Sequence, residues 1–203
     1  MGIVEVYYYF MEKSVVLKDG SMLEISRPCG KDAAEILSYL KIIGGETHFL
    51  MMDSNGLGIS EEKEAAILED SLKEERGGMH IGRINGEIAC MFSLVCSHRR
   101  KTAHTGEIAL SVQKKFWHIG VGSAIMETLI KLAEDACVEN IELGVYADNV
   151  RAIALYERYG FEAAGRHRRK FYADGIYYDE LIMDKYIEVD QNKLREIRKA
   201  CPR

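Results

Sequence analysis

The spacing of hydrophobic and polar residues changes repeatedly between a strand period and a helix period from Met22 to Asp184. This stretch contains no internal repeat and no low-complexity tract. Strands and helices that follow one another in mixed order predict an α/β or α+β fold, in which helices pack against a sheet.

Two helices are expected in the first half of this stretch. The first follows Asp32, an N-cap residue, and ends at Gly44-Gly45, because glycine commonly closes a helix. Ser60 caps the second helix, whose expected buried side is Ile67, Leu68 and Leu72. A short strand at 23–26 precedes both helices.

A hairpin is expected around Asn85-Gly86. This dipeptide separates two runs of strand type, 79–84 and 87–95. It is also the dipeptide that most readily adopts the two positive φ angles of a type I′ turn. The two runs should therefore pair in antiparallel fashion.

The second half alternates strands with helices. Four strands are expected, at 108–112, 141–145, 161–172 and 176–183, and the last two turn at Asp174-Gly175. A helix at about 120–136 has the apolar stripe Val121, Ile125, Leu129, Leu132 and Ala136. Asn149 caps a further helix, which Gly160 closes.

The two ends lie outside this pattern. We expect an N-terminal extension at 1–20, one domain at 21–186 and a C-terminal helical tail at 187–203. The aromatic run Tyr7–Phe10 is expected to pack against the domain or a second subunit, and 190–199 to form a short polar helix.

Charge and composition narrow the functional classes. With 27 Lys and Arg against 32 Asp and Glu, the net charge of −5 gives no overall positive field for nucleic acid. The five cysteines are odd in number and form no C-x-x-C pair, which argues against a disulfide framework and a zinc site. No run reaches the roughly 18 apolar residues of a membrane span. We expect a soluble, cytoplasmic, metal-free protein.

Two basic clusters stand out locally, at 98–101 and at 166–170. Such clusters near strand ends usually belong to solvated turns or strand edges. A docking surface for an acidic substrate is the alternative.

The segment 112–123 carries the first chemical signal. It runs from a strand end through a loop into a helix, with Gly120 and Gly122 at the helix start. Backbone N–H groups there have no helical partner, and glycine lets an anion approach closely. A G-x-G pair serves close helix packing equally well. A dinucleotide motif is disfavoured because Ile125 occupies the third glycine position, and no P-loop motif occurs.

The segment 149–161, N-V-R-A-I-A-L-Y-E-R-Y-G-F, carries the second signal. It resembles the N-x-x-A-x-x-L-Y-x-x-x-G-F signature of the GNAT superfamily of N-acetyltransferases, and the glycine loop lies upstream at the usual distance. The element order is similar over about 23–184, whereas the specific motifs occupy 108–161. The resemblance implies a single mixed α+β domain, whose central, mostly antiparallel twisted sheet is flanked by helices and has splayed middle strands.

The resemblance also implies where acetyl-CoA binds. The strand end Leu110, Ser111 and Val112 would pair with the pantetheine arm, and Asn149 would hydrogen-bond the same arm. The loop residues implied in cofactor binding, mainly through backbone amides at the pyrophosphate, are Trp117, His118, Ile119, Gly120, Val121, Gly122 and Ser123. The family often has Gln or Arg where this chain has Trp117, and a basic residue where it has Ile119.

Tyr156 occupies the general-acid position of the family. A phenol with a pKa near ~10 stays protonated at pH 7 and can protonate a departing thiolate. The alkaline limb of kcat should then report a group near ~10. An isolated tyrosine on an amphipathic helix would more often be a core residue, and the surrounding motif favours the catalytic role.

The general base stays open. Relatives that acetylate ribosomal-protein N-termini have a glutamate twelve residues before the tyrosine, and this chain has Gly144 there. A lysine-like amine is neutral only about once in 2,500 molecules at pH 7, so a base or a desolvating pocket would help. The candidates are Glu107, Glu142, Glu46 and His48.

The sequence therefore predicts an acetyl-CoA-dependent N-acetyltransferase in which a primary amine attacks the thioester directly. The acceptor would be a small-molecule amine or a protein N-terminus, with no nucleic-acid or membrane partner, and the resemblance allows a homodimer. The alternative is a catalytically silent acyl-CoA sensor that binds the cofactor without turnover.

Overall fold

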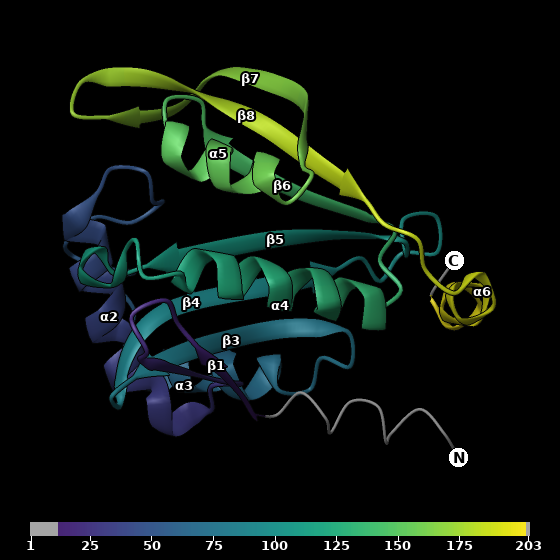
Figure 1. Ribbon diagram of the computed structural model, residues 1–203, viewed down its shortest axis with the longest axis horizontal. Coiled ribbons are helices and arrows are strands. Elements are labelled where there is room, and N and C mark those ends of the chain that lie inside the picture. Colours follow the sequence, from purple (N-terminus) through teal and green to yellow (C-terminus); the bar gives the residue numbers. More distant parts are fainter. Residues whose placement is uncertain (1–11, 202–203) are drawn as a thin grey trace. The chain divides into compact units, whose positions relative to one another are not determined.

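The computed structural model describes residues 12–201, in which hydrogen bonding links eight strands in the order β1-β2-β3-β4-β5-β6-β8-β7 (Figure 1). The strands are β1 (Glu12–Val16), β2 (Met22–Ser26), β3 (Gly77–Ile84), β4 (Glu87–Cys96), β5 (Thr105–Val112), β6 (Asn140–Tyr146), β7 (Glu162–Ala173) and β8 (Ile176–Tyr186). The helices are α2 (Ala33–Glu46), α3 (Glu61–Ser71), α4 (Val121–Asp135), α5 (Val150–Arg158) and α6 (Gln191–Ala200), with 3-10 turns η2 (Gly30–Asp32) and η3 (Lys114–Phe116). The predicted mixed α/β class is confirmed.

Backbone contacts group the chain into two compact units. The first contains the chain up to Ser93 together with Leu110–Ile125. The second contains Leu94–Ala109 together with the chain from Met126 onward. The run Tyr7–Phe10 lies outside the described residues, and the predicted domain limits stay a prediction.

The core of the first unit forms around α2. One face of this helix is buried because its apolar residues recur three or four positions apart. The core comprises Ala33, Ile36, Tyr39, Leu40 and Ile43 with Leu68, Ile81 and Ile88. Helix α3 begins as predicted, since the Ser60 hydroxyl accepts a hydrogen bond from the Lys63 amide at 3.3 Å.

Two predictions about these helices were wrong. Ile67 is 41% exposed, because α3 turns Glu64 and Leu68, four residues apart, to the protein interior instead. Helix α2 also continues through Gly44-Gly45 to Glu46. A Cβ on Gly44 would collide with the Asp53 backbone, at 3.2 Å from its Cα, so this glycine serves close packing and not helix closure.

Both predicted hairpin turns are confirmed. Asn85 and Gly86 have φ angles of 51° and 81°, and Asp174 and Gly175 have 50° and 80°. Two successive positive values are the requirement of a type I′ turn. The first turn joins β3 to β4, and the second joins β7 to β8.

The second unit is organised around β6, which pairs with β8 along its whole length. Its side chains alternate, so that Ile141, Leu143 and Val145 are buried on one face. The predicted stripe of α4 is buried at all five positions; its first two residues belong to the first unit, and Ala136 follows the last helical residue. Leu194 of α6 is fully buried, and Lys193 donates to the Asp135 carbonyl at 2.5 Å, which anchors the C-terminal helix.

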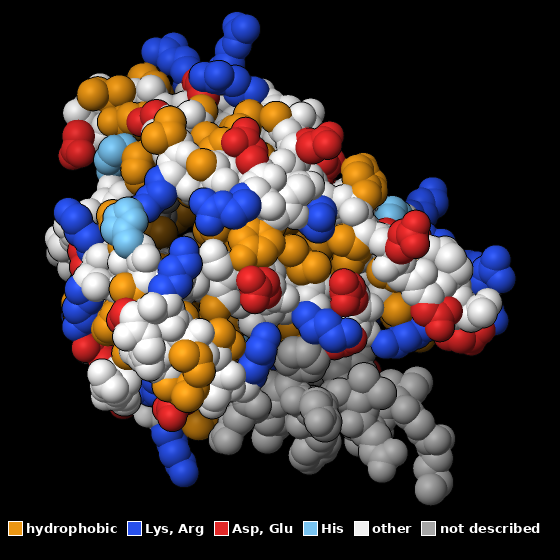
Figure 2. Space-filling model, viewed as in Figure 1, with side chains coloured by type: hydrophobic (Ala, Val, Ile, Leu, Met, Phe, Trp, Pro, Cys, Tyr) orange, Lys and Arg blue, Asp and Glu red, His pale blue; other side chains and the backbone are white. Residues whose placement is uncertain are grey.

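Within residues 12–201 no helix is both long enough and apolar enough to span a membrane. Figure 2 shows that acidic and basic side chains are interspersed on the visible face.

Candidate functional site

The glycine loop, residues 117–123, belongs to the first unit. It follows η3 and enters α4, and His118 and Gly120 have positive φ angles of 68° and 105°. The first helical hydrogen bond runs from Ala124 N to Gly120 O at 3.0 Å. The amides of Val121 and Gly122 thus precede the bonded part of the helix, where the dipole also favours an anion.

Internal hydrogen bonds brace this loop. The Trp117 indole N–H donates to the Val112 carbonyl at 2.8 Å, so the strand end and the loop are tied together. Gln113 is buried. Its backbone N–H donates to Ala89 O at 2.9 Å, and its side-chain Nε2 donates to Ile88 O at 3.0 Å. Trp117 therefore has a structural function where relatives often have Gln or Arg.

Lys18 is a residue that the sequence analysis missed. Its amide donates to the Ile119 carbonyl at 3.0 Å, and its aliphatic carbons lie 3.4 to 3.9 Å from the position of a Cβ on Gly120. An ammonium group therefore stands next to the glycine loop, although the family's basic position is occupied by Ile119. No sequence signal pointed to it, because the contact depends on the turn between β1 and β2.

The strand end before the loop is held from one side. The Ser111 hydroxyl lies 2.9 Å from the Tyr39 hydroxyl and donates to the Met91 carbonyl at 3.4 Å. The parallel pairing of β5 with β6 covers only Thr105–Glu107 opposite Asn140–Glu142. Leu110, Ser111 and Val112 lie beyond that paired stretch.

The candidate base Glu46 is already engaged. Its Oε2 accepts the Lys114 amide at 2.8 Å, at the start of η3. This carboxylate therefore supports the turn that leads into η3.

Tyr156 and Asn149 both belong to α5 in the second unit. Asn149 Oδ1 accepts the Ala152 amide at 3.2 Å and so caps the helix. Tyr156 is 7% exposed, lies 6.0 Å from the Phe161 ring between centroids, and its hydroxyl has no hydrogen-bond partner within residues 12–201. Burial raises the pKa of Tyr156 to about 12. The expected value near 10 was therefore too low, because the sequence does not reveal desolvation.

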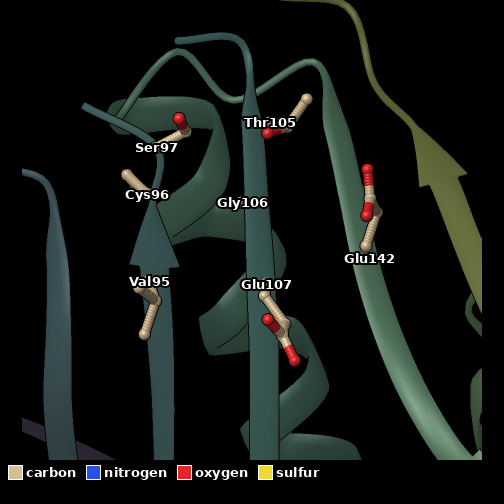
Figure 3. A pocket seen from close by; sticks show the side chains of 7 residues that line it. All are labelled: Val95, Cys96, Ser97, Thr105, Gly106, Glu107 and Glu142. Atoms are coloured by element: carbon tan, nitrogen blue, oxygen red, sulfur yellow. The ribbon is translucent and has the colours of Figure 1, made fainter. Parts of the chain in front are cut away.

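Glu107 and Glu142 line one open pocket of about 240 Å³ in the second unit (Figure 3). The two residues are register partners on β5 and β6. In Figure 3 their carboxylates point in opposite directions along the strands. Glu142 Oε1 accepts a hydrogen bond from Asn140 Nδ2 at 2.9 Å. The pocket lies where β5 and β6 are still paired, before the stretch in which they separate.

Glu180 fills the space beside Gly144. A Cβ on Gly144 would collide with the Glu180 carboxylate, at 3.1 Å from Cδ and 3.5 Å from Cγ. Glu180 Oε2 lies 2.8 Å from His167 Nδ1 and 3.8 Å from Lys170 Nζ. The basic cluster 166–170 is therefore ordered around the acidic pair Asp179-Glu180, which the sequence analysis did not consider.

Within the described part of the chain, no group of three or more His, Cys, Asp or Glu side chains is arranged to hold a metal ion.

Known proteins show what this arrangement is similar to. A profile of the Acetyltransferase (GNAT) family matches residues 48–161. The L-amino acid N-acetyltransferase AaaT of Escherichia coli K12 is 30% identical over 101 residues, which are 49% of this chain and 62% of that protein. The chain thus matches less than two thirds of this relative.

Solved structures agree in fold. An acetyltransferase of the GNAT family from Streptococcus pneumoniae superposes with a TM-score of 0.76 at 27% identity, over 82% of this chain and 99% of that one. The protein yncA of Salmonella typhimurium, solved with its cofactor acetyl-CoA, gives 0.70 at 17% identity, over 82% and 94%. With the family profile covering more than half of the chain, this protein belongs to the GNAT family of acetyltransferases.

Proposed function

We propose that this protein transfers the acetyl group of acetyl-CoA to a primary amine by direct attack of the amine on the thioester. The observation that carries the proposal is the strand–loop–helix unit 110–123, in which an edge without a β6 partner leads into unbonded amides at the start of α4. Such amides favour a pyrophosphate, and the Lys18 ammonium adds a cation beside them.

Acetyl-CoA supplies the activated acetyl group. In this proposal Leu110, Ser111 and Val112 bind the pantetheine arm through backbone groups, and the loop 117–123 binds the pyrophosphate. Asn149 binds the arm through Nδ2, since its Oδ1 caps α5. Tyr156 holds a proton on its phenol oxygen that can pass to the departing sulfur, and its raised pKa keeps it protonated over the working range.

Small amines, and L-amino acids first among them, are the acceptors that we propose. The support is the likeness to an L-amino acid N-acetyltransferase, which is limited to 101 residues. A protein N-terminus offers the same α-amine and belongs in the same test.

The test is a panel of L-amino acids, polyamines and short peptides, with free thiol release as the signal and isothermal titration of acetyl-CoA beside it. The proposal expects cofactor binding together with thiol release that depends on at least one amine. Cofactor binding without release for any amine would favour the acyl-CoA sensor. No binding at millimolar acetyl-CoA would contradict both.

A further inference from the structure

We propose that Glu180, held over Gly144 by His167, binds the ammonium group of the acceptor and takes its proton. This inference rests on the proposed function, and it assigns the base that the sequence left open. Every residue that it uses belongs to the second unit.

The location follows from strand register. Glu180 on β8 lies opposite Tyr146 on β6 and opposite His167 on β7. Directly opposed residues point to the same face of a sheet, and alternate residues along a strand share that face. Gly144 and Tyr146 therefore share the face of Glu180, whereas Leu143 and Met183 are buried on the other face.

Gly144 leaves room for the carboxylate. Gly144 has no side chain of its own, and it is exposed on a strand whose pairing with β5 has ended two residues earlier. The Glu180 carboxylate extends across into that space. A substrate amine that reaches the open stretch of β6 would thus meet this carboxylate first.

One oxygen of Glu180 is anchored and the other is available. Oε2 makes the contacts to His167 Nδ1 and Lys170 Nζ. Oε1, the atom nearest to the Gly144 space, has no partner within residues 12–201. With its side chain 15% exposed, Glu180 is fixed, mostly desolvated and still open on one side.

The anchoring depends on an irregularity in β7. The register between β7 and β8 shifts between His167 and Phe171, and Arg169 within that bulge has a φ of 54°. Asp179 stabilises the bulge by accepting the Arg169 amide at 2.8 Å and Arg166 Nε at 2.7 Å. Strand register places His167 opposite Glu180, and the bulge that follows brings Lys170 to the same carboxylate.

Aromatic rings stand next to the carboxylate. Tyr146 stacks on Phe171 with centroids 3.9 Å apart, and Tyr178 lies 5.7 Å from Tyr146. Aromatic faces attract cations and exclude water. A carboxylate beside such a cluster fits a primary ammonium group.

The proton step balances simply. An N–H bond of the ammonium breaks and an O–H bond forms at Oε1, which leaves the lone pair on nitrogen for the attack. The carboxyl group then loses the proton to water. The titratable groups that face Glu180 are Tyr146 from β6, His167 and Lys170 from β7, and Tyr178 on β8 itself.

The first experiment compares Glu180→Gln with Glu162→Gln, an exposed carboxylate on β7. With an acceptor found in the amine panel, we expect Glu180→Gln to lower kcat/KM at pH 7 by about 100-fold and to leave the Kd for acetyl-CoA unchanged. The deficit should shrink as the pH approaches the pKa of the amine, because the ammonium group then loses its proton to solvent without help. Glu162→Gln should behave as the unmodified protein.

A second experiment moves the carboxylate. Glu180→Gly should lose activity, and Gly144→Glu added to it should restore at least tenfold, because both positions reach the same space. Normal kcat/KM in Glu180→Gln, or a deficit that does not change with pH, would overturn the inference while the proposed function stands.

If no amine is acetylated, a binding measurement distinguishes a failure of the proposed function from a failure of the inferred amine site. Benzylamine added to ¹⁵N-labelled protein should shift the amide signals of Gly144 and Glu180 in the unmodified chain and not in Glu180→Gln. Absence of turnover with this shift present contradicts only the proposed function. Absence of the shift overturns the amine site as well.

Discussion

Among single residues, Tyr156 offers the test of whether the family motif is catalytic in this protein. Tyr156→Phe keeps the ring against Phe161 and removes only the hydroxyl. We expect kcat to fall by about 100-fold or more, with the Kd for acetyl-CoA within a few-fold and little change in stability. The matched control is Tyr159→Phe on the same helix turn, which removes a hydroxyl bonded to Glu127 and should leave kcat unchanged.

The same tyrosine sets the alkaline behaviour. Because burial raises its pKa to about 12, Tyr156 stays protonated and kcat should show no limb near pH 10 that the Phe variant lacks. Between pH 10 and 12 the unfolded chain loses this proton and the folded chain retains it, so stability falls as the pH rises. An alkaline limb near pH 10 that disappears in Tyr156→Phe would contradict this account.

His80 should make the stability of the fold depend on pH in the acidic range. Its side chain is buried on β3 and stacks on Phe92, and burial, with the Arg27 charge second, lowers its pKa to about 4. As the pH falls from about 6.5 to 4, the unfolded chain binds a proton at His80 that the folded chain does not bind. We expect up to about 3 kcal/mol of stability to be lost over this window.

The measurement is the free energy of unfolding against pH for the unmodified chain and for His80→Phe. The variant should lack the part of the acid slope that His80 contributes. Equal slopes for both proteins would show that His80 does not titrate as its burial implies.

At the scale of elements, α2 contains two adjacent glycines whose replacement by alanine should have opposite effects on stability. Gly44→Ala forces a methyl group into the Asp53 backbone and should lower the free energy of unfolding by about 1–3 kcal/mol. Gly45→Ala meets only Ser54 Cβ at an ordinary 3.5 Å and should stabilise by up to about 1 kcal/mol through helix propensity. Denaturant midpoints of the two variants check this, and equal shifts would argue against the close approach of the 53–56 turn.

The start of α4 carries the cofactor prediction. Gly122→Asp places a carboxylate where the proposed pyrophosphate lies, so the Kd for acetyl-CoA should rise at least about tenfold while the melting temperature changes little. Asn55→Asp adds the same charge in an exposed loop and should leave the Kd unaltered. Calorimetric titration decides, and unchanged affinity in folded Gly122→Asp would argue against the proposed site.

These elements also show what a sequence can predict. The turns at Asn85-Gly86 and Asp174-Gly175 and the caps at Ser60 and Asn149 were predictable because local backbone chemistry determines them. The end of α2 was not predictable, since Gly44 is required by Asp53, a neighbour only in the folded chain. Local rules fail where a tertiary contact decides.

The candidate site likewise contains residues that the sequence predicted and residues that it did not. The glycine loop and the motif around Tyr156 are continuous in sequence and were recognised from it. Lys18 beside Gly120 comes from the turn between β1 and β2, and Glu180 beside Gly144 comes from β8. The contacts that hold Glu180 come from β7, whose register shifts at a bulge. The sequence contained both residues without any pattern that linked them to the site.

On the scale of the whole molecule, the glycine loop belongs to the first unit, and Tyr156 and Glu180 belong to the second. The proposed reaction is acetyl transfer to nitrogen, and membership of the GNAT family does not name the acceptor.

The most direct measurement follows an isotope-labelled acetyl group from acetyl-CoA in the presence of L-amino acids and other primary amines, with mass spectrometry of the products. We expect label on the nitrogen of at least one amine, in an amount equal to the free CoA released. Label that remains entirely on acetyl-CoA, with the cofactor bound and every amine unmodified, would contradict the proposed reaction.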